Sequence, residues 1–228
     1  MKHIPNAITC CNLISGCLAV IFACYGVFPW ALWAIIAGAV FDFFDGMAAR
    51  LLHVSSPIGK ELDSLADVVT FGVAPSVMLS MWLGGNSIHD HSTILPYVTF
   101  LPLLMAAFSA LRLAKFNLDE RQTMGFIGLP TPANALFWAS LIVGWGRHLA
   151  LFPAIVPVAL VMMLLSCYLL VSEIPMFALK FKTWGWRGNE VKWCFLLSCL
   201  PLIVIFGIGS FAIIIAWYVL LSIVTMRH

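Results

Sequence analysis

Long apolar stretches recur along almost the whole chain, separated by short polar segments. A helix of about 17–25 predominantly apolar residues can cross a lipid bilayer. The stretches lie at residues 8–26, 30–50, 61–83, 94–115, 130–146, 151–172, 191–206 and 208–225. We therefore predict an all-α integral membrane protein, a polytopic bundle of about eight transmembrane helices. The last two are treated as separate helices because 191–225 is too long for one crossing and contains Gly207 and Gly209.

The composition agrees with this interpretation. Hydrophobic residues make up 62% of the 228 residues and charged residues only 10%, whereas a soluble domain has about 45–50% apolar and about 25% charged residues. The net charge of +2 is too small to indicate a nucleic-acid partner. No low-complexity tract or soluble segment interrupts the pattern, so we predict a single transmembrane domain over 1–228, with the helices of 191–225 at its periphery.

The basic residues indicate how the helices are oriented. When the eight predicted helices are threaded through a bilayer, all twelve lysines and arginines except Arg147 fall on one side. Membrane proteins keep their Lys- and Arg-rich short loops in the cytoplasm. We therefore predict that both termini are cytoplasmic.

Four aspartates lie near the predicted cytoplasmic ends of the second and third helices. Asp42 and Asp45 are three residues apart, and Asp63 and Asp67 are four apart, so each pair shares one face of its helix. A short loop containing Pro57 joins the two helices and makes them antiparallel neighbours. Both pairs therefore lie at the same membrane depth and can face each other.

Four carboxylates in a partly apolar pocket repel one another, and a bound cation offsets that repulsion. Oxygen ligands favour a hard divalent ion, Mg²⁺ or Mn²⁺ with Ca²⁺ as a further candidate, and the set has room for two ions. Gly46, Ala49 and Gly59 leave space for a nucleotide diphosphate, and Arg50 suits a phosphate oxygen. The alternative is that two aspartates form structural salt bridges with Arg50 and Lys60, but the complete set in this register argues against it.

These residues form the pattern D-x2-D-G-x2-A-R-x8-G-x3-D-x3-D over residues 42–67. The pattern resembles the signature of the CDP-alcohol phosphatidyltransferase family. Further segments are similar to the membrane-type phosphatidylserine synthase branch of that family, and together they cover most of residues 4–182: IPNAITCCNLISG, DSLADVVTFGVAP, LRLAKFN, FIGLPTPANA and VSEIPMFALKFK. The two helices predicted over 191–225 carry no such motif.

The resemblance implies that a phosphatidyl group moves from CDP-diacylglycerol to the hydroxyl of L-serine by metal-assisted direct displacement, which gives phosphatidylserine and CMP. It implies that Asp42, Asp45, Asp63 and Asp67 bind two divalent ions, with Asp67 also the catalytic base. The implied CDP-lipid-binding residues are Asn6, Thr9, Asn12, Gly46, Ala49, Arg50, Gly59 and Ser64. A homodimer in the cytoplasmic or inner membrane of a prokaryote is expected, with the active site near the cytoplasmic face.

The acceptor site is expected among basic residues on the same side. Serine carries a carboxylate, which Arg112 and Lys115 can pair with, and Asn117 and Lys180 are further candidates. The alternative for these basic residues is that they only anchor the protein to anionic headgroups. Arg112 is the residue that we favour most for a substrate role.

Two other functions remain open from the sequence. One is the same chemistry with glycerol 3-phosphate or inositol as acceptor, or with an archaeal ether lipid as donor. A phosphorylated acceptor would favour a denser basic cluster than the one seen here. The other is a divalent-cation or proton-coupled transporter that uses the aspartates as its ion site. Transporters commonly show internal repeats and helices broken near the membrane midplane, and the sequence shows no repeat.

Overall fold

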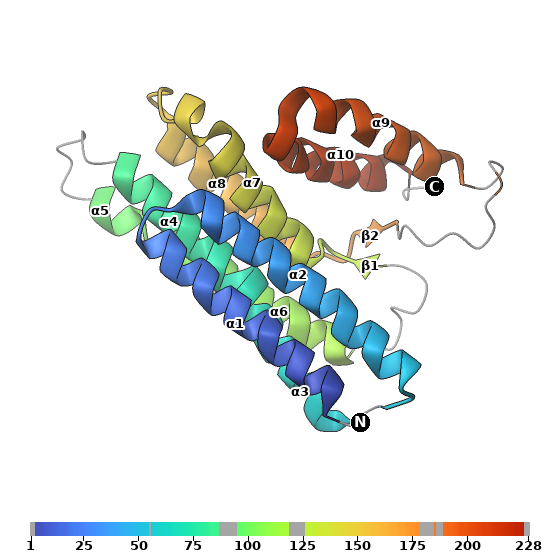
Figure 1. Cartoon of the computed structure of the whole chain (residues 1–228). Coiled ribbons are helices and arrows are strands. Elements are labelled where there is room, and N and C mark those ends of the chain that lie inside the picture. Colours follow the sequence, from blue (N-terminus) through green and yellow to red (C-terminus); the bar gives the residue numbers. More distant parts are fainter. Residues whose placement is uncertain are drawn as a thin grey trace.

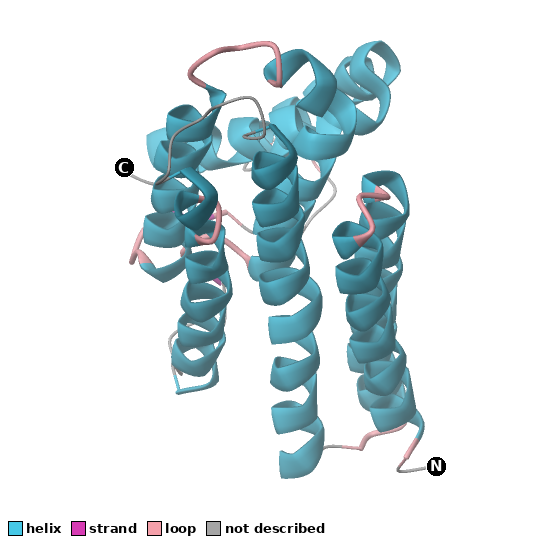
Figure 2. Cartoon of the chain, turned by 90° about the vertical axis from the view of Figure 1, so that its left-hand side faces the viewer, coloured by secondary structure: helices cyan, strands magenta, loops and turns pink. Residues whose placement is uncertain are grey.

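The computed structural model is almost entirely helical (Figure 1), as the colouring by secondary structure in Figure 2 shows. It describes residues 3–54, 56–86, 95–118, 126–177, 185 and 189–225. The α-helices are α1 (Ile4–Cys24), α2 (Phe28–Leu51), α3 (Pro57–Asp67), α4 (Ala74–Asn86), α5 (Leu95–Val98), α6 (Leu104–Leu118), α7 (Thr131–Leu149), α8 (Ile155–Val171), α9 (Glu190–Phe206) and α10 (Ser210–Thr225). A π-helix, η1 (Val68–Val73), joins α3 to α4, and 3-10 turns η2 (Leu101–Leu103) and η3 (Gly207–Gly209) precede α6 and α10.

Each apolar stretch predicted from the sequence contains a helix in the structure. Segments long and apolar enough to cross a membrane are Ile4–Cys24, Phe28–Leu51, Pro57–Gly85, Leu101–Leu118 and Glu190–Thr225, while α8 is apolar but shorter. The fold is thus that of a helical membrane protein, and the number of about eight crossings stays a prediction. The predicted break near Gly207 is confirmed, because α9 ends at Phe206 and Gly207 has a φ of 53°.

One feature departs from the predicted all-α architecture. Strands β1 (Phe126–Ile127) and β2 (Pro175–Met176) form a short antiparallel pair in which Phe126 lies opposite Met176. The backbone N–H of Leu129 donates to the carbonyl of Leu169 at 2.9 Å, so the chain entering α7 runs against the end of α8. Two-residue strands are too short to produce an alternating sequence pattern, which is why they were not predicted.

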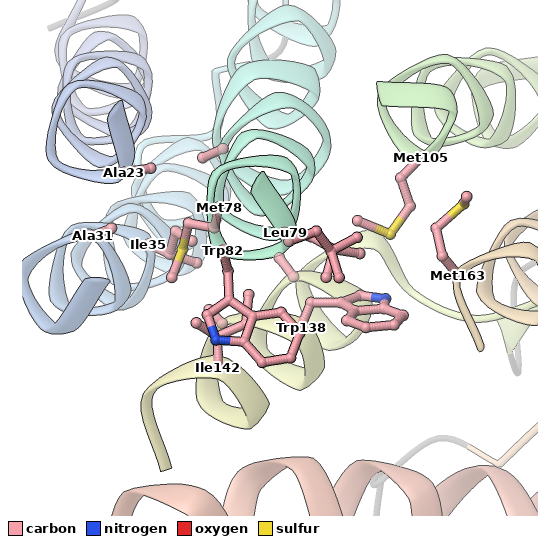
Figure 3. Close-up of a cluster of buried hydrophobic side chains, with 14 of the residues drawn as sticks. Ala23, Ala31, Ile35, Met78, Leu79, Trp82, Met105, Trp138, Ile142 and Met163 are labelled. Carbon is pink, nitrogen blue, oxygen red and sulfur yellow. The ribbon is translucent and has the colours of Figure 1, made fainter. Parts of the chain in front are cut away.

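The apolar core lies between the long helices. Figure 3 shows Trp82 of α4 close to Ile142 and Trp138 of α7, with Met78 of α4 and Ile35 of α2 beside them. Many apolar side chains point outward instead, among them Val204, which is 85% exposed. Because lipid tails are as apolar as these side chains, close packing of the helices rather than hydrophobic exclusion holds such a bundle together.

Two glycines allow α1 and α2 to approach η1 closely. A Cβ atom on Gly16 would lie only 2.8 Å from the Cα of Thr70, and one on Gly38 would overlap the Thr70 side chain. The Thr70 hydroxyl donates to the carbonyl of Asn12 at 3.0 Å. This contact fixes the position of η1, and with it the end of α3, relative to α1 and α2.

Candidate active site

Three carboxylates converge between the second half of α2 and the second half of α3. Asp42 on α2 and Asp63 and Asp67 on α3 each offer an oxygen, and these oxygens lie within 4.8 Å of one another. The antiparallel arrangement expected from the short loop is present, since the chain reverses after His53, which has a φ of 52°. The N-terminus of α3 is fixed by Ser56, whose hydroxyl accepts the backbone N–H of Gly59.

The three carboxylates form a donor set suited to a metal ion. Asp67 is buried, and Asp42 and Asp63 are half-buried. The Asp63 Oδ1 atom is itself buried and has no hydrogen-bond partner among the described residues. Negative charges this close in a partly desolvated site repel strongly unless a cation neutralises them. The all-oxygen set fits a hard divalent ion such as Mg²⁺ or Mn²⁺.

Asp45 lies beside this trio and has a different partner. Its Oδ2 atom accepts a hydrogen bond of 2.6 Å from the Thr9 hydroxyl of α1, and its side chain is buried. The predicted set of four carboxylates is therefore divided in the structure into three that converge and Asp45, which lies beside them and is bonded to Thr9. A three-residue step on a helix rotates the side chain by about 60°, which turns Asp45 toward Thr9 while Asp42 faces α3.

Asp67 is held by a residue of α1. The Asn12 side chain is fully buried, and its Nδ2 donates to the Asp67 Oδ1 atom at 3.0 Å. Asn12 was predicted to bind the CDP-lipid, but in the structure its described contact is with the carboxylate. Its backbone carbonyl also accepts the Thr70 hydroxyl described above. Asn12 thus orients Asp67 and leaves the second carboxylate oxygen of Asp67 available to another group.

A cavity of about 560 Å³ opens beside the carboxylates between α1, α2 and α3. Most of the predicted CDP-lipid-binding residues line it: Asn6, Thr9, Gly46, Ala49, Arg50 and Gly59. A Cβ atom on Gly46 would meet nothing within 4 Å, so this glycine keeps the backbone itself accessible. Asp45 and Asp63 also reach the cavity. It therefore combines carboxylates, cations and bare backbone, as a nucleotide diphosphate site requires.

The cavity is also lined by two basic residues that were not predicted as site residues. Lys60 and His53 line the same space, and the Lys60 Nζ atom donates to the carbonyl of Asn117 at 2.9 Å. Lys60 had been considered only as a salt-bridge partner of an aspartate. Its position one residue after Gly59 in the signature is the sequence signal that could have included it.

Ser64 and Asn117 form a link between α3 and α6. The Asn117 Nδ2 donates to the Ser64 hydroxyl at 2.8 Å, and that hydroxyl lies 3.2 Å from the carbonyl of Lys60. Neither residue lines the cavity. The described hydrogen bonds of Ser64, a predicted CDP-lipid residue, and Asn117, a predicted acceptor residue, are thus with each other and with Lys60.

Arg112 on α6 is buried beside the carboxylates. It is 7% exposed, and its Nε atom has no hydrogen-bond partner among the described residues. Its guanidinium lies 5.7 Å from the ring centre of Phe116 and close enough to Asp67 and Tyr218 to interact with them electrostatically. Lys115 is exposed. Lys180, the fourth predicted acceptor residue, lies outside the described residues.

Helices α9 and α10 also reach this part of the molecule. α9 and α10 pack against each other, and α10 packs on α7 (Figure 1). Tyr218 of α10 donates its hydroxyl hydrogen to the carbonyl of Phe177 at 2.9 Å, and its ring contacts those of Phe177 and Phe195. Tyr218 was not predicted as a site residue, and the sequence of α10 contains no motif that would identify it.

The fold and the carboxylate site define a helical membrane protein with a cluster of three carboxylates suited to a hard cation. The CDP-alcohol phosphatidyltransferase family model matches residues 2–184. The chain therefore belongs to the CDP-alcohol phosphatidyltransferase family, as the signature indicated. α9 and α10 lie outside the matched region.

Curated relatives carry a more specific name. The chain is 42% identical over 133 residues to the CDP-diacylglycerol–serine O-phosphatidyltransferase of Bacillus subtilis, covering 58% of this chain and 71% of that protein. It is 36% identical over 134 residues to the Helicobacter pylori (strain J99) protein of the same name, covering 58% of this chain and 54% of that protein. The Methanocaldococcus jannaschii protein of that name is 35% identical over 142 residues, covering 62% of this chain and 59% of that protein.

Proposed function

We propose that this protein transfers the phosphatidyl group of CDP-diacylglycerol to the hydroxyl of L-serine, giving phosphatidylserine and CMP. The observation that carries the proposal is the convergence of Asp42, Asp63 and Asp67 beside the 560 Å³ cavity. Membership of the family and the shared name of the relatives above support the reaction and the acceptor.

The donor would bind in the cavity. Gly46 and Ala49 leave the surface of α2 open for the cytidine and diphosphate, while Arg50 and Lys60 supply positive charge for phosphate oxygens. A divalent ion held by Asp42, Asp63 and Asp67 would neutralise the diphosphate and stabilise the charge on departing CMP. We propose two such ions, with Asp45 completing the second set of ligands.

Asp67 is the proposed catalytic base. Asn12 holds one of its carboxylate oxygens, so the other is oriented to take the proton of the acceptor hydroxyl as that oxygen attacks phosphorus. Arg112, buried beside Asp67, is the proposed partner of the serine carboxylate. Its Nε, which has no hydrogen-bond partner among the described residues, can donate to a carboxylate oxygen. The acceptor would then approach from the α6 side, with its hydroxyl toward Asp67.

Acceptor choice tests this proposal. Purified protein given radiolabelled CDP-diacylglycerol should form product with serine and not with glycerol 3-phosphate or inositol offered separately. Arg112→Ala should raise the KM for serine by about 10- to 100-fold, because a hydrogen bond to a charged group is lost, and should leave CDP-diacylglycerol binding nearly intact. Serine titrations and a CMP competition assay measure the two effects.

The matched control is Arg147→Ala, at the far end of α7, which should leave the KM for serine unchanged. An unaltered serine dependence in Arg112→Ala would remove Arg112 from the acceptor site. Weaker CDP-diacylglycerol binding in that variant would instead assign Arg112 to the lipid phosphate.

The proposed topology has eight crossings and both termini in the cytoplasm. Cysteine labelling can test it in a variant in which the exposed native thiols are replaced: Cys10, Cys11, Cys17, Cys24 and Cys194. A cysteine at Arg147 should react with an impermeant reagent added outside intact cells, whereas one at Ser56 should not. Reaction of the Ser56 position would reverse the proposed orientation. The homodimer stays a prediction. Measuring the mass of the purified protein in detergent tests it.

A further inference from the structure

Several polar side chains near η1 are buried without partners. On α7, neither the Nδ2 nor the Oδ1 atom of Asn134 has a hydrogen-bond partner among the described residues, and the same holds for the Thr131 hydroxyl. Both side chains are fully buried. On α6, the Ser109 hydroxyl and the Arg112 Nε atom are also buried and have no hydrogen-bond partner among the described residues. Buried polar atoms are normally hydrogen-bonded, so such a group needs either a strong reason or a ligand.

These side chains flank the same segment from two helices. Ser109 lies against Gly72 of η1, since a Cβ atom on Gly72 would be 3.0 Å from the Ser109 Cβ. α7 also packs on η1. Arg112, one turn further along α6, is the residue that interacts with Asp67. The unpartnered groups of α6 and α7 therefore border the segment that follows the proposed base.

The height of Asn134 along the bundle follows from a contact at the other end of α7. A Cβ atom on Gly146 would lie 2.9 Å from the Trp82 Nε1 atom of α4. Few residues follow Gly146 in α7, so the part of α7 that packs on η1 must precede Gly146. Because η1 likewise precedes α4, α7 runs parallel to α4. Asn134 precedes Gly146 by the same twelve positions by which Thr70 precedes Trp82. Since helices rise about 1.5 Å per residue, Asn134 lies near the level of Thr70.

Thr131 precedes Gly146 by as many positions as Asp67 precedes Trp82, so Thr131 lies near the level of Asp67 along the bundle. The hydroxyl of Thr131 and the amide of Asn134 thus lie one turn apart on α7. Thr131 is at the level of Asp67, the proposed base, and Asn134 is at the level of Thr70. A small acceptor whose hydroxyl is at Asp67 would have Arg112 of α6 on one side and these two residues on the other.

The chemistry of the two sides is complementary to a zwitterion. The guanidinium of Arg112 suits a carboxylate, and the amide oxygen of Asn134 can accept from an ammonium group while its NH₂ donates elsewhere. A neutral amide has an advantage here over a carboxylate. Another negative charge next to Asp42, Asp63 and Asp67 would compete for the cation that these three are placed to bind.

We propose that Asn134, assisted by Thr131, binds the ammonium group of the amino-acid acceptor and so determines its selection over acceptors that lack this group. This rests on the proposed function, because it names a further part of the acceptor site of that reaction. Both residues lie in FIGLPTPANA, one of the segments that are similar to the phosphatidylserine synthase branch of the family. Asn134 would touch the substrate but take no proton.

The test compares serine with glycerate, in which a hydroxyl replaces the ammonium group. In Asn134→Leu, which keeps the size and removes both polar atoms, the KM for serine should rise by about 10- to 100-fold. The affinity for glycerate, measured by competition against serine, should change far less, so the serine-to-glycerate ratio should fall. CDP-diacylglycerol binding, measured by competition with CMP, should be retained.

Ser140→Ala is the matched control, because Ser140 is buried on the same helix but its hydroxyl bonds the carbonyl of Phe137. It should leave both acceptor affinities unchanged. If Asn134→Leu fails to fold, Thr131→Val takes its place in the test. Thr131→Val should also lower the ratio of serine affinity to glycerate affinity. An unchanged ratio in the folded variant overturns the proposal. If the wild-type protein uses glycerol 3-phosphate and not serine, the proposed function itself is overturned. The acceptor assay with radiolabelled CDP-diacylglycerol tests this independently of the variants.

Discussion

Asp67→Asn should reduce turnover by about 10²- to 10⁴-fold, the usual contribution of a positioned acid–base group. The substitution keeps the size of the side chain, and its amide oxygen can still accept the hydrogen bond of 3.0 Å from the Asn12 Nδ2 atom. The variant should therefore fold, while the group that takes the acceptor proton is lost. Initial rates at saturating serine and CDP-diacylglycerol measure the effect.

Two further variants make this result specific. Asp42 is proposed only as a metal ligand, whereas Asp67 is also the proposed base. If Asp67 acts chiefly as the base, Asp42→Asn should weaken metal and CDP-diacylglycerol binding more than Asp67→Asn does. Ser76→Ala serves as the neutral control, because Ser76 is buried further along the same continuous helix and bonds only the carbonyl of Gly72 among the described residues. Turnover near the wild-type value in Asp67→Asn would exclude Asp67 as the base.

Removal of divalent metal should abolish transfer altogether, and Mg²⁺ or Mn²⁺ should restore it. The three carboxylates lie within 4.8 Å of one another, and the Asp63 Oδ1 atom is buried without a described partner. Without a cation their repulsion opposes both folding and the approach of an anionic diphosphate. Activity after dialysis against EDTA, with and without added metal, measures the effect on transfer.

A binding measurement separates the metal site from catalysis. Calorimetry with Mn²⁺ should show binding to the wild-type protein and a large loss of affinity in Asp63→Asn, irrespective of turnover. A ligand that binds only the folded state also raises the unfolding midpoint, so added Mn²⁺ should stabilise the wild-type protein and not this variant. Full transfer activity in a metal-free preparation would contradict a metal-dependent mechanism.

The sequence predicted the part of the site that depends on helical spacing. Steps of three and four residues and a short loop were sufficient to place Asp42, Asp63 and Asp67 together. The partner of Asp45 could not be predicted, because it depends on the rotation of α2 against α1 rather than on spacing within α2. The break before α10 was predictable, since Gly207 interrupts a stretch that is too long for one crossing.

Other features could not be predicted because they arise only from packing. Asn134 and Thr131 look like ordinary polar residues near the start of an apolar helix, and only their burial without partners in the described part of the chain distinguishes them. The position of Tyr218 could not be predicted either, because its proximity to Arg112 joins residues far apart in the chain. The π-helix η1 has the sequence VVTFGV, which contains no residue that specifies its wider turn.

The wider turn of η1 determines where this helix can lose a residue. An α-helix rotates by about 100° per residue, so a deletion in α4 before Met78 would turn the aspartates away from the apolar face that carries Met78 and Trp82. A π-turn contains one residue more than an α-turn. Deleting one residue between Asp67 and Ala74 should convert η1 into ordinary α-helix and keep both faces in phase. We therefore expect a one-residue gap at this point of an alignment to keep the aspartates in phase with that apolar face, whereas the same gap between Ala74 and Met78 should not.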